Sequence, residues 1–198
     1  MSNYPEFFDT IEPILVQDPL ARILGAFENG EYEIPYIEVV KAAGHSCPTV
    51  AGAYLMTQKA LHRLYDGGRA VRGDIEVEFG ESLQEGVAGV VANVVSHITG
   101  ATDKSGFKGL GGKFARHSLM YFERDIQTSA RFTRKDTQQS VEVIYDHSMI
   151  ATDPQMKPLM QKMMMQEATP QELKRFGEIW QSRVAEIFKQ SDKVLKVL

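Results

Sequence analysis

The 198-residue sequence lacks the features that mark several large classes of protein. It has a single cysteine, Cys47, so no disulfide can form within the chain, which fits a reducing compartment. It has no run of about 20 apolar residues with which to cross a bilayer. Its first ten residues lack the basic flank and the apolar segment of a secretory signal. We therefore expect a cytoplasmic protein with no membrane partner.

An excess of positive charge is also absent. The chain carries 22 Lys and Arg against 26 Asp and Glu, a formal net charge of -4, which gives no electrostatic reason to expect nucleic acid as a partner. Hydrophobic residues make up 43% of the chain, enough for a packed core in one domain of this length. The composition leaves open whether the protein binds a small-molecule ligand or a protein partner.

The single cysteine lies in the sequence Gly44-His45-Ser46-Cys47-Pro48-Thr49, which precedes an apolar helical pattern. Proline is favoured as the first residue of a helix, and the residue before a proline is pushed out of helical geometry. We therefore expect Cys47 at or next to a helix N-cap, where free backbone N–H groups and the helix dipole favour negative charge. A thiolate forms more easily there than on a free thiol.

His45 and Cys47 support two functional hypotheses and one structural alternative. An imidazole and a thiolate together bind a divalent transition metal, most often zinc. Alternatively, Cys47 is a catalytic nucleophile or a redox-active thiol that works without a metal and is activated by His45. An inert cysteine that packs like a small apolar residue would give the same spacing. Whether the protein is an enzyme stays open at this point.

His97 is the best internal candidate for a third metal ligand. It lies on a helix expected over residues 86–100, with Asn93 one turn earlier on the same face. His117 is the alternative, because it alternates with apolar residues on an expected strand. His147 follows the end of another expected strand, and we interpret it as part of a solvated turn.

A segment rich in glycine and lysine follows this helix, from residue 100 to 113. It does not have the spacing of a nucleotide-binding P-loop, which is Gly-x-x-x-x-Gly-Lys-Ser/Thr. Lys104, Lys108 and Lys113 are nevertheless candidates for binding an anionic cofactor. A lid over a site, or a solvated connection, would have the same composition.

The apolar periodicity predicts an α+β fold, with a mixed or antiparallel sheet packed against helices, because helices and strands do not alternate regularly. We divide the chain into a domain at 1–150, whose first part (1–30) is helical, and a C-terminal helical extension at 151–198. The residues at 34–40 are β-branched and aromatic and predict a strand. Further helices are expected over 48–66, over 86–100, and from 153 and 169; further strands are expected over 71–79, 116–123, 129–134 and 140–145.

The motif Gly44-His45-Ser46-Cys47-Pro48, followed by a helix with Gly52 and Leu61, resembles the Gly-His-x-Cys-Pro opening of the FmdE family. That family is named for one of the subunits of the tungsten and molybdenum formylmethanofuran dehydrogenases. The order of elements that follows is similar too: a strand at 75–79, a helix that ends in Thr99-Gly100, the glycine- and lysine-rich loop, and a strand at 114–122.

This resemblance implies a small α+β domain, commonly a homodimer, that holds a metal, usually zinc, near the His-x-Cys motif. It also implies an accessory place in a larger molybdenum or tungsten oxidoreductase complex. Family members tend to carry Asp-x-x-Gln on the second helix and Thr-Gly-Cys after it, where this chain has Asn93, Ser96 and Thr99-Gly100-Ala101. The second cysteine and the carboxylate are therefore absent. Three alternatives follow: His97 completes the site with His45 and Cys47, the metal is bound weakly, or the metal is lost.

Overall fold

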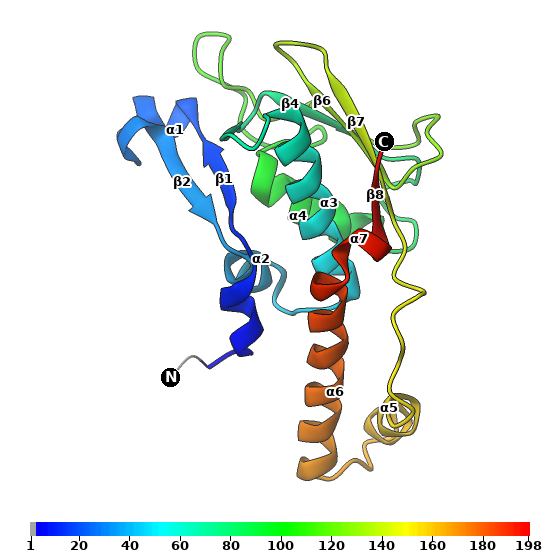
Figure 1. The fold of residues 1–198 in the computed structure, drawn as a ribbon. Helices are drawn as coiled ribbons and strands as arrows, with labels where there is room; N and C mark the ends of the chain where they lie inside the picture. Colours follow the sequence, from blue (N-terminus) through cyan, green and yellow to red (C-terminus); the bar gives the residue numbers. More distant parts are fainter. Residues whose placement is uncertain (1–2) are drawn as a thin grey trace.

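Two β-sheets and seven α-helices make up residues 3–198, the part of the chain that the computed structural model describes (Figure 1). The expected α+β class is confirmed. The helices are α1 (Pro19–Ile23), α2 (Tyr36–Ala43), α3 (Pro48–Leu64), α4 (Ala88–Thr99), α5 (Met156–Met164), α6 (Pro170–Lys189) and α7 (Ser191–Val194), with 3-10 turns η1 (Glu6–Thr10) and η2 (Glu28–Gly30). No helix among these residues is long and apolar enough to cross a membrane.

The smaller sheet has the strand order β2-β1-β3 and the larger one the order β5-β4-β6-β7-β8. In the smaller sheet β1 pairs antiparallel with β2, placing Ile14 opposite Ile34, and parallel with β3. In the larger sheet β4 pairs parallel with β5, and the other neighbouring strands pair antiparallel. The strands are β1 (Ile14–Gln17), β2 (Glu31–Ile34), β3 (Ala70–Val71), β4 (Ile75–Glu78), β5 (Met120–Tyr121), β6 (Ala130–Arg134), β7 (Ser140–Tyr145) and β8 (Leu195–Val197).

The helix α3 is the centre of the core, and twelve of its residues are buried. It packs against α4, α6 and β7, so the residues at its start meet both the larger sheet and the C-terminal helix. Gly52 permits the closest of these contacts, because a Cβ atom at this position would lie 2.2 Å from Cε1 of Tyr145. Figure 1 shows α6 beginning beside α5 and running toward the sheets, where α7 leads into β8, which lies beside β7.

Helices with strong local signals lie where the sequence predicted them. The helix α3 begins at Pro48, and α4 ends before Gly100, whose φ of 75° is in the left-handed region that glycine adopts easily. The helix α6 begins with a capping box, in which Thr169 and Glu172 satisfy each other's free backbone N–H groups.

Three predicted elements are wrong in type or extent. The stretch 34–40 is not one strand: β2 ends at Ile34 and α2 follows, so packing of Tyr36 and Val39 into the core outweighs the β-propensity of this segment. The N-terminal stretch contains β1 as well as helical turns. The strand at 71–79 is divided at Gly73, whose φ is 80°, and its two halves join different sheets.

The two strands at the edges of the larger sheet, β5 and β8, also differ from prediction. Only Met120–Tyr121 of the expected strand 116–123 is paired, and β8 was not predicted at all. Because β8 pairs antiparallel with β7, with Val197 opposite Val143, the C-terminal segment completes the larger sheet instead of only extending it with helices.

Candidate functional site

Cys47 is the N-cap residue of α3, as the proline after it predicted. Its backbone is extended (φ -149°, ψ 170°), and its Sγ accepts the N–H of Val50 over 3.4 Å. The side chain is nearly buried, with 9% of its surface exposed. The sulfur therefore occupies the position where a helix start offers its free N–H groups.

The residue before this cysteine is fixed by hydrogen bonds from two other helices. The carbonyl oxygen of Ser46 accepts Nε1–H of Trp180 over 2.9 Å and Nε2–H of Gln181 over 3.1 Å, both from α6. Its hydroxyl lies 2.9 Å from the hydroxyl of Tyr36 at the start of α2. The sequence predicted only a helix from residue 169 here, so this role of α6 was missed.

Two tyrosine rings flank the same corner. The hydroxyl of Tyr145 donates to the carbonyl oxygen of Pro48 over 2.8 Å. Burial raises the pKa of both Tyr36 and Tyr145, and the negative charge of a Cys47 thiolate would raise both further. Both phenols are therefore neutral donors at physiological pH, and neither can serve there as a base.

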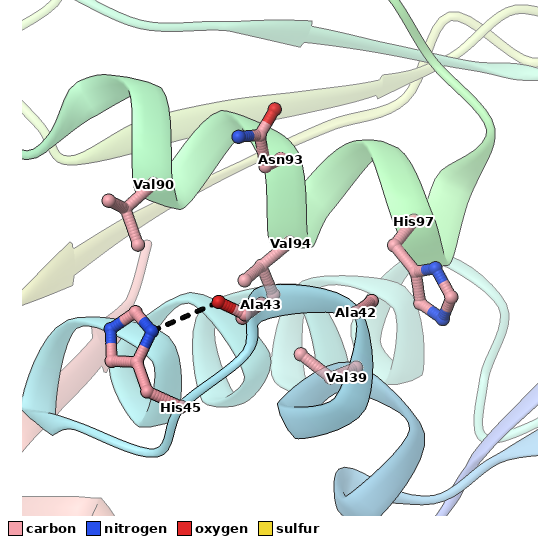
Figure 2. Close-up of a pocket in the computed structure, with 8 residues that line it drawn as sticks. All are labelled: Val39, Ala42, Ala43, His45, Val90, Asn93, Val94 and His97. Carbon is pink, nitrogen blue, oxygen red and sulfur yellow. Dashed lines mark hydrogen bonds between the residues drawn. The ribbon is translucent and has the colours of Figure 1, made fainter.

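His45 lies on the exposed side of the motif, where its Nδ1 is 3.0 Å from the carbonyl oxygen of Ala43 (Figure 2). A carbonyl oxygen can only accept, so Nδ1 carries the proton in this contact. In the neutral ring Nε2 then has a free lone pair. This is the arrangement in which a histidine binds a metal through Nε2 while its other nitrogen is held by a backbone carbonyl.

His45 and His97 line one small pocket of about 190 Å³ between α2 and α4, but they lie at opposite ends of it (Figure 2). Cys47 does not line this pocket. Burial, with the positive charge of Arg72 as the second cause, lowers the pKa of His97, so its ring is neutral at pH 7. The other residues around the pocket are Val39, Ala42, Ala43, Val90, Asn93 and Val94.

A closed metal centre made by one chain does not fit this geometry. Among residues 3–198, no three His, Cys, Asp or Glu side chains lie together in a way that could hold a metal ion. One chain thus offers His45 and Cys47 on a single turn, with His97 across the pocket. Metal binding, and zinc in particular, stays a prediction.

The position of His97 depends on a buried charge network at the end of α4. Arg72 donates to the carbonyl oxygens of His97 and Ile98, over 3.0 and 2.9 Å, at the negative end of the helix dipole. Arg72 and Arg116 both pair with Asp18, over 3.1 and 2.6 Å, and Asp18 is almost fully buried. These contacts connect α4 to the smaller sheet.

The three candidate lysines lie on the surface. Lys104, Lys108 and Lys113 are exposed, and Nζ of Lys108 donates to the carbonyl oxygen of Lys104. His117 has its Nδ1 3.0 Å from the hydroxyl of the adjacent Ser118. Binding of an anionic cofactor by the lysines therefore stays a prediction.

His147 begins a turn, as expected, because its carbonyl oxygen accepts the N–H of Ile150 over 3.1 Å. The expectation that its side chain is solvated was wrong. Its ring is half-buried and stacks on Tyr145, with ring centres 5.5 Å apart and planes 3° from parallel. Burial, together with the charge of Arg183, lowers its pKa. A signal was present in the sequence, since residues 143, 145 and 147 alternate and therefore share one face if the strand direction continues.

The fold and the site together define a class of α+β protein. In this class a cysteine is the N-cap residue of the central helix, and a C-terminal helix holds the turn before that cysteine in place. The chain matches the model of the family described as "FmdE, Molybdenum formylmethanofuran dehydrogenase operon" over residues 42–196. This match covers most of the chain, which therefore belongs to the FmdE family. It begins just before the Cys47 motif and runs through α6 into β8. Among curated proteins, none matches the chain significantly.

Proposed function

We propose that this FmdE-family protein has an accessory role beside a molybdenum formylmethanofuran dehydrogenase, and that it acts as a homodimer holding one zinc ion per chain at the His45–Cys47 corner. The family description supports the accessory role. The observation that carries the metal proposal is the orientation of His45, whose Nδ1 is held by a backbone carbonyl while its Nε2 is left free.

The dimer follows from the number of ligands that one chain offers. A structural zinc site has four ligands and a catalytic one keeps three from protein, whereas His45 and Cys47 supply two. Because no cluster of three forms within residues 3–198, we propose that His97 of a second copy supplies the next ligand. The family's missing second cysteine would be replaced in this way.

Elemental analysis of the untagged protein, combined with a molar mass measured by light scattering, tests this proposal. We expect about one equivalent of zinc per chain in a dimer, lost on Cys47→Ala, His45→Ala and His97→Ala. His62→Ala is the matched control, because His62 is an exposed histidine on α3 that should leave the metal content unchanged. Full metal content in Cys47→Ala would overturn the metal proposal.

The accessory role has a separate test. Sedimentation of the purified protein with a purified molybdenum formylmethanofuran dehydrogenase should give a complex that neither component forms alone. Independent sedimentation at micromolar concentrations of both proteins would contradict that role and leave the metal proposal standing.

A metal-free thiol protein is the second candidate function, and the hydrogen bond from Val50 N–H to the sulfur of Cys47 favours it. This candidate predicts a metal-free wild type in which iodoacetamide alkylates Cys47 at neutral pH without unfolding. If the native thiol reacts only at the rate of global unfolding, the cysteine is inert packing and this candidate is excluded.

A further inference from the structure

The largest cavity near the start of α3 is not the pocket that contains His45 and His97. It has a volume of about 590 Å³ and lies between α3, the end of β4, the start of α4, the segment 124–129 and the end of β7. None of His45, Cys47 and His97 lines it. Its volume is in the range of pockets that bind small molecules.

The inner wall of this cavity is apolar and partly aromatic. Met56 and Phe79 are almost fully buried, with 2% and 3% of their surface exposed. Phe79 is stacked against Phe122 outside the wall, and Tyr145 is stacked against His147, so two ring pairs stiffen it. A wall of this kind favours a flat apolar ligand, since such a ligand gains contact without ordering flexible side chains.

The rim of the cavity has unused hydrogen-bonding groups. Among residues 3–198, the side chains of Thr49, Glu81, Gln127 and His147 make no hydrogen bond or ion pair with the protein, and all four line the cavity. They offer a hydroxyl, a carboxylate, an amide and an imidazole. A ligand that presents both donors and acceptors at its edge can therefore be satisfied here.

The charges around the rim argue against an anion. Arg124 is the one Lys or Arg of the described part of the chain that lines the cavity, and it already pairs with Glu78 over 2.9 Å. Its neighbour Arg131 is shared between Glu78 and Glu142, over 3.1 and 2.7 Å. Arg183 acts on His147 from outside the cavity. Among the described residues that line the cavity, however, Glu81 has no positive partner and there is no unpaired cation, so an incoming carboxylate or phosphate would meet the negative charge of Glu81.

We infer that this cavity is a binding site for an uncharged heteroaromatic molecule of about two fused rings, with its plane against the Phe79 wall and its polar edge toward Gln127 and Thr49. This site is independent of the metal and of the accessory role proposed above. It does touch the same helix start, because Tyr145 lines the cavity and donates to the carbonyl oxygen of Pro48.

The test uses quinazolin-4-one, a neutral fused heteroaromatic ring system with a donor and an acceptor, as the probe for ligand-detected NMR titration of the full chain. For a fragment of this size we expect a dissociation constant on the order of 1 mM. Val87→Trp should weaken binding about tenfold or more, because Val87 lines the mouth and is 52% exposed, so a larger side chain there fills the cavity at little cost to folding.

Leu110→Trp is the matched control. Leu110 is 48% exposed, apolar and outside the cavity, so this variant should bind the probe as the wild type does. The charged analogue 2-naphthoate should bind at least about fivefold more weakly than quinazolin-4-one. The proposal is overturned if the probe does not bind at about 10 mM, if Val87→Trp and Leu110→Trp bind it equally, or if naphthoate binds more tightly.

Discussion

The indole N–H of Trp180 donates to the carbonyl oxygen of Ser46 over 2.9 Å, although the two residues are 134 positions apart in the chain. Gln181 donates to the same oxygen. The C-terminal helix therefore fixes the residue before Cys47, and the geometry of the motif depends on a segment that carries no motif of its own.

Removal of the indole donor should loosen this turn. In Trp180→Phe a smaller aromatic ring remains but one hydrogen bond to Ser46 is lost, so we expect the free energy of unfolding to fall by about 1 kcal/mol or more and alkylation of Cys47 to become faster. Urea unfolding and mass spectrometry measure the two effects. Leu173→Ala, at an exposed position of the same helix, should change stability by less than about 0.5 kcal/mol. If neither quantity changes in Trp180→Phe, the contact does not hold the turn.

Two glycines in helices should respond in opposite directions to the same substitution. Gly52→Ala should destabilise the protein by about 1–3 kcal/mol, since the new Cβ would lie 2.2 Å from Cε1 of Tyr145 and the ring must move. Gly177→Ala, on α6, meets no atom within 4 Å and should stabilise the protein by about 0.5–1 kcal/mol through helix propensity. Thermal unfolding distinguishes the two, and equal effects would contradict the packing at Gly52.

The buried carboxylate of Asp18 should matter far more than a carboxylate on the surface. Asp18→Asn keeps a side-chain oxygen that can cap α1 but leaves Arg72 and Arg116 without their counter-charge, so we expect a loss of about 3–5 kcal/mol. Glu31→Gln breaks the exposed pair with Arg69 and should cost less than about 1 kcal/mol. Chemical denaturation measures both, and similar small losses would mean that the network is dispensable.

Stability should depend on pH through His147. Burial and Arg183 hold its folded-state pKa below the ordinary value of 6.5, so the unfolded chain takes up the proton more readily. The contribution of the neutral ring is therefore complete above pH 6.5 and declines as the pH falls below it toward the folded-state pKa. His147→Gln should flatten this part of the stability curve between about pH 5 and 7. A curve with the same slope in the variant would assign the dependence to other groups.

The sequence was most informative where a structure is decided by neighbouring residues. Pro48 places Cys47 at the N-cap whatever surrounds it, and the Thr169–Glu172 capping box starts α6 in the same local way. By contrast, the residues of α2 have the β-branched character of a strand. They form a helix because Tyr36 and Val39 reach the core from it, and a single sequence does not contain that information.

In the candidate site, too, local sequence predicted some features and tertiary packing decided the others. The motif identified His45 and Cys47, but whether His97 lies beside them depends on how α2 and α4 pack, and they pack with the two histidines at opposite ends of a pocket. Trp180, Gln181 and His147 were missed as site residues because each reaches the start of α3 only through tertiary contacts.

The distance in the chain between the Cys47 motif and α6 also has a consequence for biosynthesis. At a translation rate of about 5–20 residues per second, the nascent chain carries Cys47 for roughly 7–27 s before Trp180 and Gln181 have been polymerised. During that interval the carbonyl oxygen of Ser46 lacks both of its α6 donors, and the single thiol of the protein is open to oxidation or premature metal capture. A chaperone that shields this thiol during synthesis would therefore act before the C-terminal helix docks.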